Sequence, residues 1–356
     1  MQIGIIGLPL AGKTTIFNAL TGDNQPTIHS GGRFEVHTAV VDVPDARVDS
    51  LTELYQPHKT AYAKVTYCDI AGLEGSERKV SYSGPLLNQL SGMDGFMHVV
   101  RCFENASVPY PSGALDPMRD LEALNSEMLV NDLILVERRL ERLAQELNSG
   151  GGRDKALVRR EQELFERLET ALGDEIPLRT LKFSRDEEKT ISGFGFLTQK
   201  PMLILFNTSD GQSAPCVDYP GGRCEVVALQ GKLEMDIAQL EPGDKALFMA
   251  EYGFEESSLK RVINESYCLM ELQSFFTVGE DEVRAWTVPV GATALEAAGV
   301  IHSDLQKGFI RAEVVGYADL IELGGLSEAR LKGKLRLEGK DYIVLDGEIV
   351  HVRFNV

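Results

Sequence analysis

The sequence predicts an α/β fold with a mostly parallel sheet, an inserted antiparallel helical hairpin and a small α+β module at the C-terminal end. Three observations support this prediction. Short apolar runs alternate with helical patterns, a heptad-like leucine series occupies the middle of the chain, and strand patterns return after residue 275. The length of 356 residues agrees with several domains, because single hydrophobic cores stop growing at roughly 250 to 300 residues.

Four apolar segments supply the expected strands of the sheet, namely residues 3–6, 65–70, 95–102 and 202–206. Each is largely apolar or β-prone, as expected of strands covered on both faces. The first is followed by a loop that contains Gly and Pro and by residues 13–20, whose apolar members recur at helical spacing. The chain is therefore expected to begin with a strand, a loop and a helix.

A helical insertion is predicted between the third and fourth strands. Its first helix carries apolar residues that advance by 4, 3, 4, 3 and 4 positions: Leu129, Leu133, Val136, Leu140, Leu143 and Leu147. The segment from Ser149 to Gly152 then interrupts the helix. A second stripe follows at Leu157, Leu164, Leu168 and Leu172. Two amphipathic helices joined by a glycine loop predict an antiparallel hairpin, with a solvated outer face that includes Arg138, Arg139, Arg159 and Arg160.

The C-terminal module is predicted from strand and turn signals. Residues 283–289 alternate like a strand, and residues 293–300 resemble a short helix. Residues 342–344 and 349–354, separated by Asp346-Gly347, predict a β-hairpin. We therefore expect a nucleotide-binding domain at 1–117 and 200–275, a helical domain at 118–199 and the C-terminal module at 276–356.

Composition restricts the partners and the compartment. The 36 basic and 54 acidic residues give a net charge of −18, which disfavours broad attraction to nucleic-acid backbones. The N-terminus lacks a basic leader, and no apolar run is long enough to span a bilayer. A cytoplasmic protein without membrane or DNA partners is expected.

The histidines and cysteines show no pattern of a metal site. The five cysteines are scattered, without a C-x-x-C pair, which fits neither a disulfide framework nor zinc ligation. Cys68 and Cys102 fall in predicted strands and are interpreted as core thiols. His98 is interpreted as a satisfied core residue, not a ligand.

The most specific motif is a complete phosphate loop, G-x-x-x-x-G-K-[ST], at residues 7–14. Its glycines let backbone N–H groups point at phosphates, Lys13 reaches the β and γ oxygens, and the Thr14 hydroxyl ligates Mg²⁺. The residues expected to bind the phosphates are Pro9, Leu10, Ala11, Gly12, Lys13, Thr14 and Thr15.

A second motif, Asp69-Ile70-Ala71-Gly72, ends the next predicted strand. The Asp69 carboxylate is expected to hold Mg²⁺ together with Thr14, and Gly72 to sense the γ-phosphate. Lys13 and Gly72 are thus the candidate catalytic residues. Leu73 stands where small GTPases carry a glutamine that orients water, so intrinsic hydrolysis is expected to be slow, on the order of 10⁻⁴ per second.

A third motif follows the fourth strand at Asn207-Thr208-Ser209-Asp210, where guanine-binding NTPases place N-K-x-D. An Asp carboxylate there accepts hydrogen bonds from guanine N1 and its amino group, a donor pair that adenine lacks. The usual lysine is replaced by Thr208. Asn207, Thr208 and Asp210 are expected to bind the base, supported by Gln230, Gly231 and Lys232.

The chain resembles the YchF or Obg-like ATPase family of translation-associated P-loop NTPases along its whole length. The resemblance rests on the phosphate loop and on the segments at 43–47, 69–73, 98–105, 196–201, 272–277, 282–293, 307–313 and 339–342. It implies a C-terminal TGS-like domain with a ubiquitin-like fold, Mg²⁺ and ATP or GTP as ligands, and a ribosome or another RNA-containing partner. The family also carries a hydrophobic residue at the position of Leu73.

Several positions depart from the family pattern. Residues 31–35 replace the first-switch segment that carries a metal-binding Thr, for which Thr38 could substitute only with a shifted register. Residues 74–80 replace a glycine- and lysine-rich second switch, and Tyr110 aligns with a loop histidine considered catalytic in the family. The family's N-x-x-E, associated with ATP preference, ends here in the shorter Asp210. Hydrolysis is therefore expected to be slower still or absent.

Three functions follow as hypotheses. The first is a purine-nucleotide switch that relays the nucleotide state through loops 23–38 and 73–84. The second is an interaction scaffold that binds nucleotide without turnover, and the third is a small-molecule kinase. A local patch could contact ribosomal phosphates and consists of Arg330, Lys332, Lys334, Arg336 and Lys340.

Overall fold

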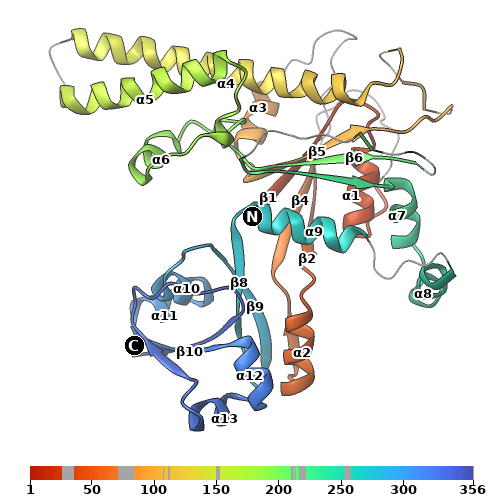
Figure 1. Cartoon of the computed structure of the whole chain (residues 1–356), viewed down its shortest axis with the longest axis vertical. Helices are drawn as coiled ribbons and strands as arrows, with labels where there is room; N and C mark the ends of the chain where they lie inside the picture. Colours follow the sequence, from red (N-terminus) through yellow and green to blue (C-terminus); the bar gives the residue numbers. More distant parts are fainter. Residues whose placement is uncertain are drawn as a thin grey trace. The chain divides into compact units, whose positions relative to one another are not determined.

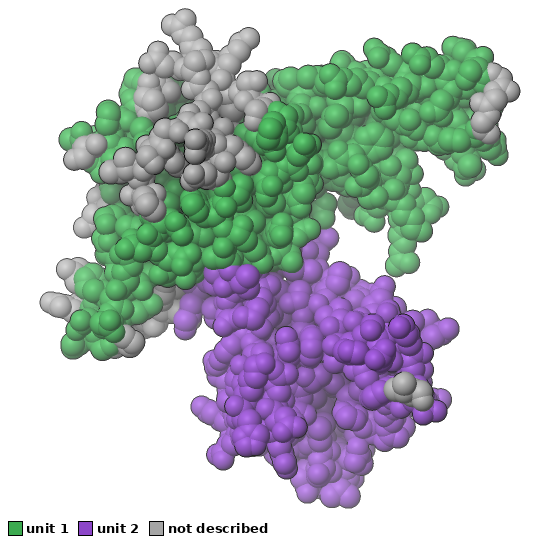
Figure 2. All heavy atoms as spheres, turned by 180° about the vertical axis from the view of Figure 1, so that it is seen from behind, with its two compact units in different colours: residues 1–39, 66–259 green, residues 40–65, 260–356 purple. Residues whose placement is uncertain are grey.

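The computed structural model describes residues 1–25, 36–70, 84–106, 108–110, 113–149, 153–209, 212, 214–215, 222–251 and 258–355. These residues form two compact units, one of residues 1–39 and 66–259 and one of residues 40–65 and 260–356 (Figure 2). The three domains expected from the sequence remain a prediction.

The first unit is built on a six-stranded sheet in the order β2-β4-β1-β5-β6-β7 (Figure 1). The strands are β1 (Gln2–Ile6), β2 (Val36–Asp42), β4 (Lys64–Ile70), β5 (Gly95–Arg101), β6 (Met202–Asn207) and β7 (Cys224–Leu229). Parallel pairs join β1 to β4 and β5, and β6 to β5 and β7. The α/β class, the mostly parallel sheet and the four predicted strands are confirmed.

The sequence patterns missed β2 and β7, the two edge strands of this sheet. Exposed residues are interspersed along both of them, whereas every residue of β5 and β6 is buried. An edge strand has one uncovered side, so it lacks the continuous apolar run that identifies a central parallel strand.

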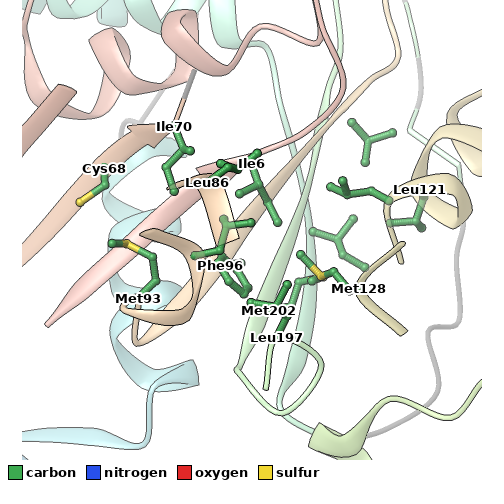
Figure 3. Packing of buried hydrophobic residues seen from close by; sticks show 14 of the residues in the cluster. Ile6, Cys68, Ile70, Leu86, Met93, Phe96, Leu121, Met128, Leu197 and Met202 are labelled. Atoms are coloured by element: carbon green, nitrogen blue, oxygen red, sulfur yellow. The ribbon is translucent and has the colours of Figure 1, made fainter. Parts of the chain in front are cut away.

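The helices of the first unit are α1 (Lys13–Thr21), α3 (Gly84–Ser91), α7 (Gly231–Ala238) and α8 (Pro242–Glu251), besides the inserted ones described below. Helix α9 (Ser258–Leu269) begins at the end of this unit and continues into the second. A hydrophobic core lies between the sheet, α3 and the N-terminal half of α4 (Pro117–Asn148) (Figure 3). Phe96, Leu124 and Met202 are fully buried in it.

The helical hairpin consists of α4 and α5 (Lys155–Gly173), which lie antiparallel side by side (Figure 1). Asp116 caps α4 by accepting a hydrogen bond from Arg119 N, with Pro117 at the first helical position. All six predicted seam residues of α4 belong to the core shared with α5. The insertion also contains a 3₁₀ turn (Leu178–Thr180) and α6 (Arg185–Ile191), which the sequence patterns did not predict.

The predicted stripe of α5 was wrong at one position. Leu157 is 54% exposed, whereas its neighbour Val158 is 2% exposed and packs in the hairpin core with Phe165. Adjacent helical residues point about 100° apart, so only one of the two can face α4. Arg139 also lies less exposed than expected, because Glu161 pairs with it at 2.7 Å.

The second unit contains the sheet β11-β10-β12-β8-β9-β3. Its strands are β3 (Lys59–Ala61), β8 (Leu272–Thr277), β9 (Glu282–Pro289), β10 (Phe309–Gly316), β11 (Arg336–Glu338) and β12 (Glu348–Phe354). Its helices are α2 (Ala46–Tyr55), α10 (Ala294–Ile301), α11 (Ser303–Lys307), α12 (Tyr317–Leu323) and α13 (Leu326–Leu331). A C-terminal domain of strands and helices is thus confirmed, with β9 and α10 as predicted.

The predicted hairpin at 342–354 was wrong. Residues 342–344 form no strand, because their backbone bonds run to residues 292–294: Ala294 N donates to Tyr342 O and Val344 N donates to Ala292 O. β12 instead pairs antiparallel with β10 and parallel with β8. The turn at Asp346-Gly347 is present, but it leads into β12 from an irregular segment.

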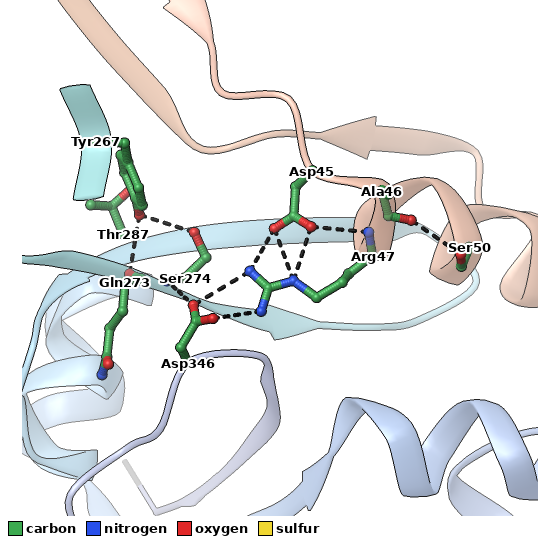
Figure 4. A network of polar contacts seen from close by, with 9 residues as sticks. All are labelled: Asp45, Ala46, Arg47, Ser50, Tyr267, Gln273, Ser274, Thr287 and Asp346. Carbon is green, nitrogen blue, oxygen red and sulfur yellow. Dashed lines mark hydrogen bonds and ion pairs between the residues drawn. The ribbon is translucent and has the colours of Figure 1, made fainter. Parts of the chain in front are cut away.

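An ion-pair network holds residues 40–65 in the second unit (Figure 4). Arg47 on α2 bonds Asp45 at 2.8 Å and Asp346 at 2.7 Å. Burial lowers the pKa of its guanidinium, but the two carboxylates together outweigh this effect and raise it. Asp346 also accepts a bond from Ser274 N on β8. Parallel pairing of β3 with β9 adds backbone bonds to this attachment.

The predicted basic patch is largely neutralised by ion pairs. Arg330 lies 3.1 Å from Glu313, Lys334 lies 3.0 Å from Asp319, and Arg336 bonds Glu348. Three of its five members are therefore paired with carboxylates, whereas Lys332 and Lys340 form no ion pair with a described residue. Over the part of the chain that the structure describes, no helix combines the length and apolarity that crossing a membrane requires.

Candidate nucleotide-binding site

The phosphate loop connects β1 to α1, and its two glycines are required by close backbone approaches. Gly7 has φ 150° and Gly12 has φ 95°. A Cβ atom at Gly7 would lie 2.3 Å from Val99 O, and one at Gly12 would lie 2.2 Å from Asn207 Nδ2. Any larger residue at either end would displace β5 or β6 from the loop. Pro9 and Thr15 are partly exposed, and Leu10 is 41% exposed at φ 61°.

Lys13 lies over this loop and is 6% exposed. Its Nζ donates to Gly7 O and Leu8 O, each at 3.0 Å. Burial lowers the pKa of the ammonium group to about 8, against an opposing attraction from Asp69. A bound phosphate would favour the charged form of Lys13, because opposite charges in a buried site stabilise each other.

Thr14 and Asp69 form the pair expected to hold a metal ion. Thr14 Oγ1 donates to Asp69 Oδ2 at 2.7 Å, and Asp69 is 1% exposed. Asp69 Oδ1 is buried and has no hydrogen-bond partner among the described residues. A buried carboxylate oxygen without a partner is costly, and a hard cation would satisfy it. These two side chains therefore fit Mg²⁺.

No cluster of three or more His, Cys, Asp or Glu side chains suited to a metal occurs in the described part of the chain. The Mg²⁺ site expected at the phosphate loop does not require such a cluster. Such a site uses one or two protein oxygens and completes its coordination with phosphates and water.

Asn207, the last residue of β6, connects the phosphate loop to α7. Its Nδ2 donates to Ala11 O in the phosphate loop at 3.0 Å, and its Oδ1 accepts from Gly231 N at the start of α7 at 3.1 Å. A Cβ atom at Gly231 would lie 2.5 Å from Ile16 Cδ1 and 2.7 Å from Asn207 Oδ1. Asn207 thus positions the phosphate loop against α7, and Gly231 permits the close packing of α7 on α1.

The other predicted base-side residues have different surroundings. Thr208 is buried, and both its backbone N and its Oγ1 donate to Leu229 O, at 2.9 and 3.3 Å. Lys232 is exposed and pairs with Asp236 at 2.6 Å. Gln230 precedes α7, and its side chain makes no capping hydrogen bond. Asp210 and Gly72 lie outside the described residues, as does Leu73.

Arg101, at the end of β5, was missed as a site residue and is 2% exposed. Its guanidinium donates to Phe103 O at 3.1 Å, to Val108 O at 2.6 Å and to Leu10 O in the phosphate loop at 3.5 Å. It also lies over the Phe103 and Tyr110 rings. The sequence signal that could have identified Arg101 as a site residue is its charge at the end of an otherwise apolar strand.

Tyr110 is anchored to the first turn of α4. Its hydroxyl donates to the Asp120 carboxylate, at 2.5 and 2.6 Å from the two oxygens, and accepts from Arg119 Nη2 at 2.8 Å. Burial, followed by the bond to Asp120, raises the pKa of the phenol to about 12. The phenol therefore remains protonated at neutral pH and is unsuited to the role of a general base.

Thr38 does not present its hydroxyl as a metal ligand. It lies in β2, and its Oγ1 donates to Cys68 Sγ at 3.7 Å. Residues 26–35, which include the atypical first-switch segment, lie outside the described residues, and so do residues 74–80.

The interpretation of the cysteines and of His98 as core residues is confirmed, with one correction. Cys68 and Cys102 are buried free thiols, and burial raises the pKa of both. His98 is 1% exposed, and burial lowers its pKa to about 3. Its Nδ1, however, has no hydrogen-bond partner in the described part of the chain, so the imidazole is a neutral and incompletely satisfied core group.

Comparisons with known proteins agree with this geometry. Residues 2–138 match the family described as 50S ribosome-binding GTPase, and residues 272–355 match the YchF-GTPase C-terminal family, described as a protein of unknown function. The Ribosome-binding ATPase YchF of Bacillus subtilis (strain 168) is 38% identical over all of both chains. That of Haemophilus ducreyi is 40% identical over 100% of this chain and 99% of its own.

A solved structure, the YchF GTPase of Schizosaccharomyces pombe, has the same fold. It superposes with a TM-score of 0.86 at 30% identity and covers 99% of this chain and 97% of its own. The similarity therefore extends over almost the whole chain. The chain belongs to the YchF family of P-loop NTPases.

Proposed function

We propose that this chain is a Mg²⁺-dependent, cytoplasmic switch that binds ATP or GTP, hydrolyses it slowly and acts on the ribosome. The observation that carries the proposal is the pairing of Thr14 with Asp69 beside Lys13, with one buried carboxylate oxygen left over. The ribosome as partner is supported by the names of its relatives, ribosome-binding ATPases, and of the matching GTPase family.

Each residue of the site has a separate task in this proposal. Lys13 neutralises phosphate charge, and the loop N–H groups from Pro9 to Thr15 bind phosphate oxygens. Thr14 and Asp69 would hold Mg²⁺, which would supply positive charge against the negative charge of the phosphates. Gly72 contacts the γ-phosphate, and Asn207 keeps the loop in place.

Slow turnover follows from what the site lacks at two positions. Leu73 has no polar group to orient a water molecule, and Tyr110 has its hydroxyl bound to Asp120. The remaining contributions are charge neutralisation and positioning, which alone give rates on the order of 10⁻⁴ per second in related switches.

The testing experiment measures equilibrium binding of ATP and GTP with Mg²⁺ and with EDTA, followed by phosphate release with and without ribosomes. The wild type should bind at least one nucleotide in a Mg²⁺-dependent manner and release phosphate slowly, and Lys13→Met should bind neither tightly. Tight binding unaffected by EDTA would contradict the metal site. Absence of any binding would overturn the proposal.

A second candidate function, a nucleotide-binding scaffold without turnover, is favoured by the surroundings of Tyr110. The phenol is held by Asp120 and Arg119 and stays protonated. If the scaffold proposal is correct, phosphate release remains near zero with ribosomes present, although binding is tight. A Tyr110→His variant should then gain measurable release if the loop histidine is what the site lacks.

The division of labour between the parts of the chain belongs to the same proposal. Residues 1–117 and 200–275 bind the nucleotide, residues 118–199 form the helical domain, and residues 276–356 form a TGS-like domain. Loops 23–38 and 73–84 relay the nucleotide state. Limited proteolysis with and without MgATP checks this, because cleavage within those two loops should be suppressed by nucleotide.

A further inference from the structure

The strand order determines which loops lie nearest to the base of a bound nucleotide. The phosphate loop follows β1, and Asp69 lies on β4, on one side of β1. On the other side follow β5, β6 and β7. Ligands of open α/β sheets bind outside the carboxyl ends of the strands. A nucleotide with its phosphates on the loop therefore extends its base across the ends of β5 to β7.

Most polar side chains at these strand ends already have protein partners. Asn207 bonds both Ala11 O and Gly231 N, and Thr208 Oγ1 donates to Leu229 O. Ser209 Oγ donates to Gln212 Oε1 at 2.9 Å. Lys232 pairs with Asp236. Among the described residues, these contacts leave few polar side chains on this edge available to a ligand.

Gln230 is the exception at the end of β7. It is partly exposed, and its carboxamide has no hydrogen-bond partner among the described residues, although it occupies the capping position of α7. The next residue, Gly231, is bonded to Asn207, which is itself bonded to the phosphate loop. The backbone at Gln230 is therefore held firmly next to the site, while its side chain has no hydrogen-bond partner in the described part of the chain.

A carboxamide can recognise groups of opposite hydrogen-bonding character. It carries one acceptor oxygen and one NH₂ donor, and a rotation of 180° about its last torsion exchanges them. Adenine presents a donor, the amino group, at position six of the purine, whereas guanine presents an acceptor, the carbonyl oxygen, at the same position. A lysine there would bind only the carbonyl, and a glutamate only the amino group.

We propose that Gln230 is a specificity-determining residue that contacts the six-position of the purine and lets one site accept both ATP and GTP. The inference rests on the proposed function, since it requires the nucleotide to bind at the phosphate loop. It assigns base discrimination to the residue at the capping position of α7, in place of Asp210, whose sequence motif is associated with guanine N1 and the two-amino group.

The experiment measures dissociation constants for the Mg²⁺ complexes of ATP, GTP, inosine triphosphate and purine riboside triphosphate, which has no six-substituent. For the wild type we expect ATP, GTP and inosine triphosphate to bind comparably, and purine riboside triphosphate roughly tenfold more weakly, the value of about one hydrogen bond.

Two substitutions should move the preference in opposite directions. Gln230→Lys should raise the affinity for GTP relative to ATP by about tenfold, and Gln230→Glu should do the reverse. The added charge also affects phosphate binding, but it does so equally for both nucleotides. The ratio of GTP affinity to ATP affinity within one variant is therefore independent of this effect. Gln230→Met should weaken both nucleotides and leave their ratio near the wild-type value.

The matched controls are the same three substitutions at Gln239, which caps the opposite end of α7 and is exposed. They should leave the ratio unchanged. A ratio that does not respond to Gln230→Lys or Gln230→Glu would overturn the inference, as would equal wild-type affinity for purine riboside triphosphate. Inosine lacks the two-amino group of guanine. Weak binding of inosine triphosphate together with tight binding of GTP would therefore assign base recognition to Asp210 instead of Gln230. If the wild type binds no nucleotide, the proposed function fails first.

Discussion

Thr14 Oγ1 donates to Asp69 Oδ2 at 2.7 Å, across 55 positions of sequence, and leaves Asp69 Oδ1 buried without a partner in the described part of the chain. The hydrogen bond holds together one oxygen atom from the first turn of α1 and one from the end of β4 before any ligand binds. Such preorganisation reduces the conformational cost of binding a metal with its nucleotide.

Asp69→Asn should abolish the Mg²⁺ dependence of nucleotide binding, because an amide is a far weaker ligand for a hard cation than a carboxylate. Dissociation constants measured with Mg²⁺ and with EDTA should become equal in the variant. Thr14→Ser, which keeps the hydroxyl, is the control and should retain most of the Mg²⁺ effect. A variant that still binds more tightly with Mg²⁺ would exclude Asp69 as a ligand.

Nucleotide affinity should fall as pH rises above about 8, the pKa of Lys13 in the free protein. Phosphate favours the ammonium form, so binding takes up a proton above this pH and weakens by up to about tenfold per unit. Titrations between pH 7 and 9.5 test this. Lys13→Arg stays charged and should show a flatter profile, and an identical slope in both proteins would contradict the assignment.

Folding stability should respond to the same lysine in the opposite direction. Because the pKa of Lys13 is lowered in the folded chain, the unfolded chain binds more protons between about 8 and 10.5. The contribution of Lys13 to the free energy of unfolding therefore rises with pH in this window. Urea denaturation of the wild type and of Lys13→Met at pH 8 and 10 measures this contribution. The free energy of unfolding of the wild type, relative to that of Lys13→Met, should be higher at pH 10 than at pH 8.

Asp132→Ala should destabilise the chain by about 2 to 4 kcal/mol, because it leaves buried donors without an acceptor. Asp132 is fully buried on α4 and accepts from Leu197 N at 3.0 Å, and from Thr198 N and Thr198 Oγ1 at 2.7 Å each. Thr198→Val removes only one of these donors and should cost about 1 kcal/mol. Urea denaturation measures the free energy of unfolding of both variants. Equal losses in the two would show that Asp132 does not stabilise the chain through all three donors.

Lys200→Met should increase hydrogen exchange in α3. The Lys200 ammonium donates to Leu90 O at 2.9 Å, and also to Ser91 O and Met93 O, so it caps the carboxyl end of this helix. Lys189→Met, at an exposed site on α6, is the control. Unchanged protection of residues 84–91 in the Lys200 variant would mean that packing alone holds α3.

The sequence by itself determined the features encoded in contiguous residues. The phosphate loop is one such feature, because a loop with two glycines and a lysine is specified within eight positions. The central strands are another, since burial on both faces requires an unbroken apolar run. The α4 seam was equally readable, because 3.6-residue periodicity places each of its members on one face.

Only the tertiary structure decided the features that depend on what distant segments supply. The backbone of 342–344 pairs with 292–294 and not with β12, and residues 40–65 join the second sheet through β3. At the site, Tyr110 bonds Asp120, while no described residue bonds the side chain of Gln230. The physical reason is that the sequence identifies a polar side chain but does not show whether that side chain has a hydrogen-bond partner. Its availability depends on partners that the fold brings near, and these lie far away in the sequence.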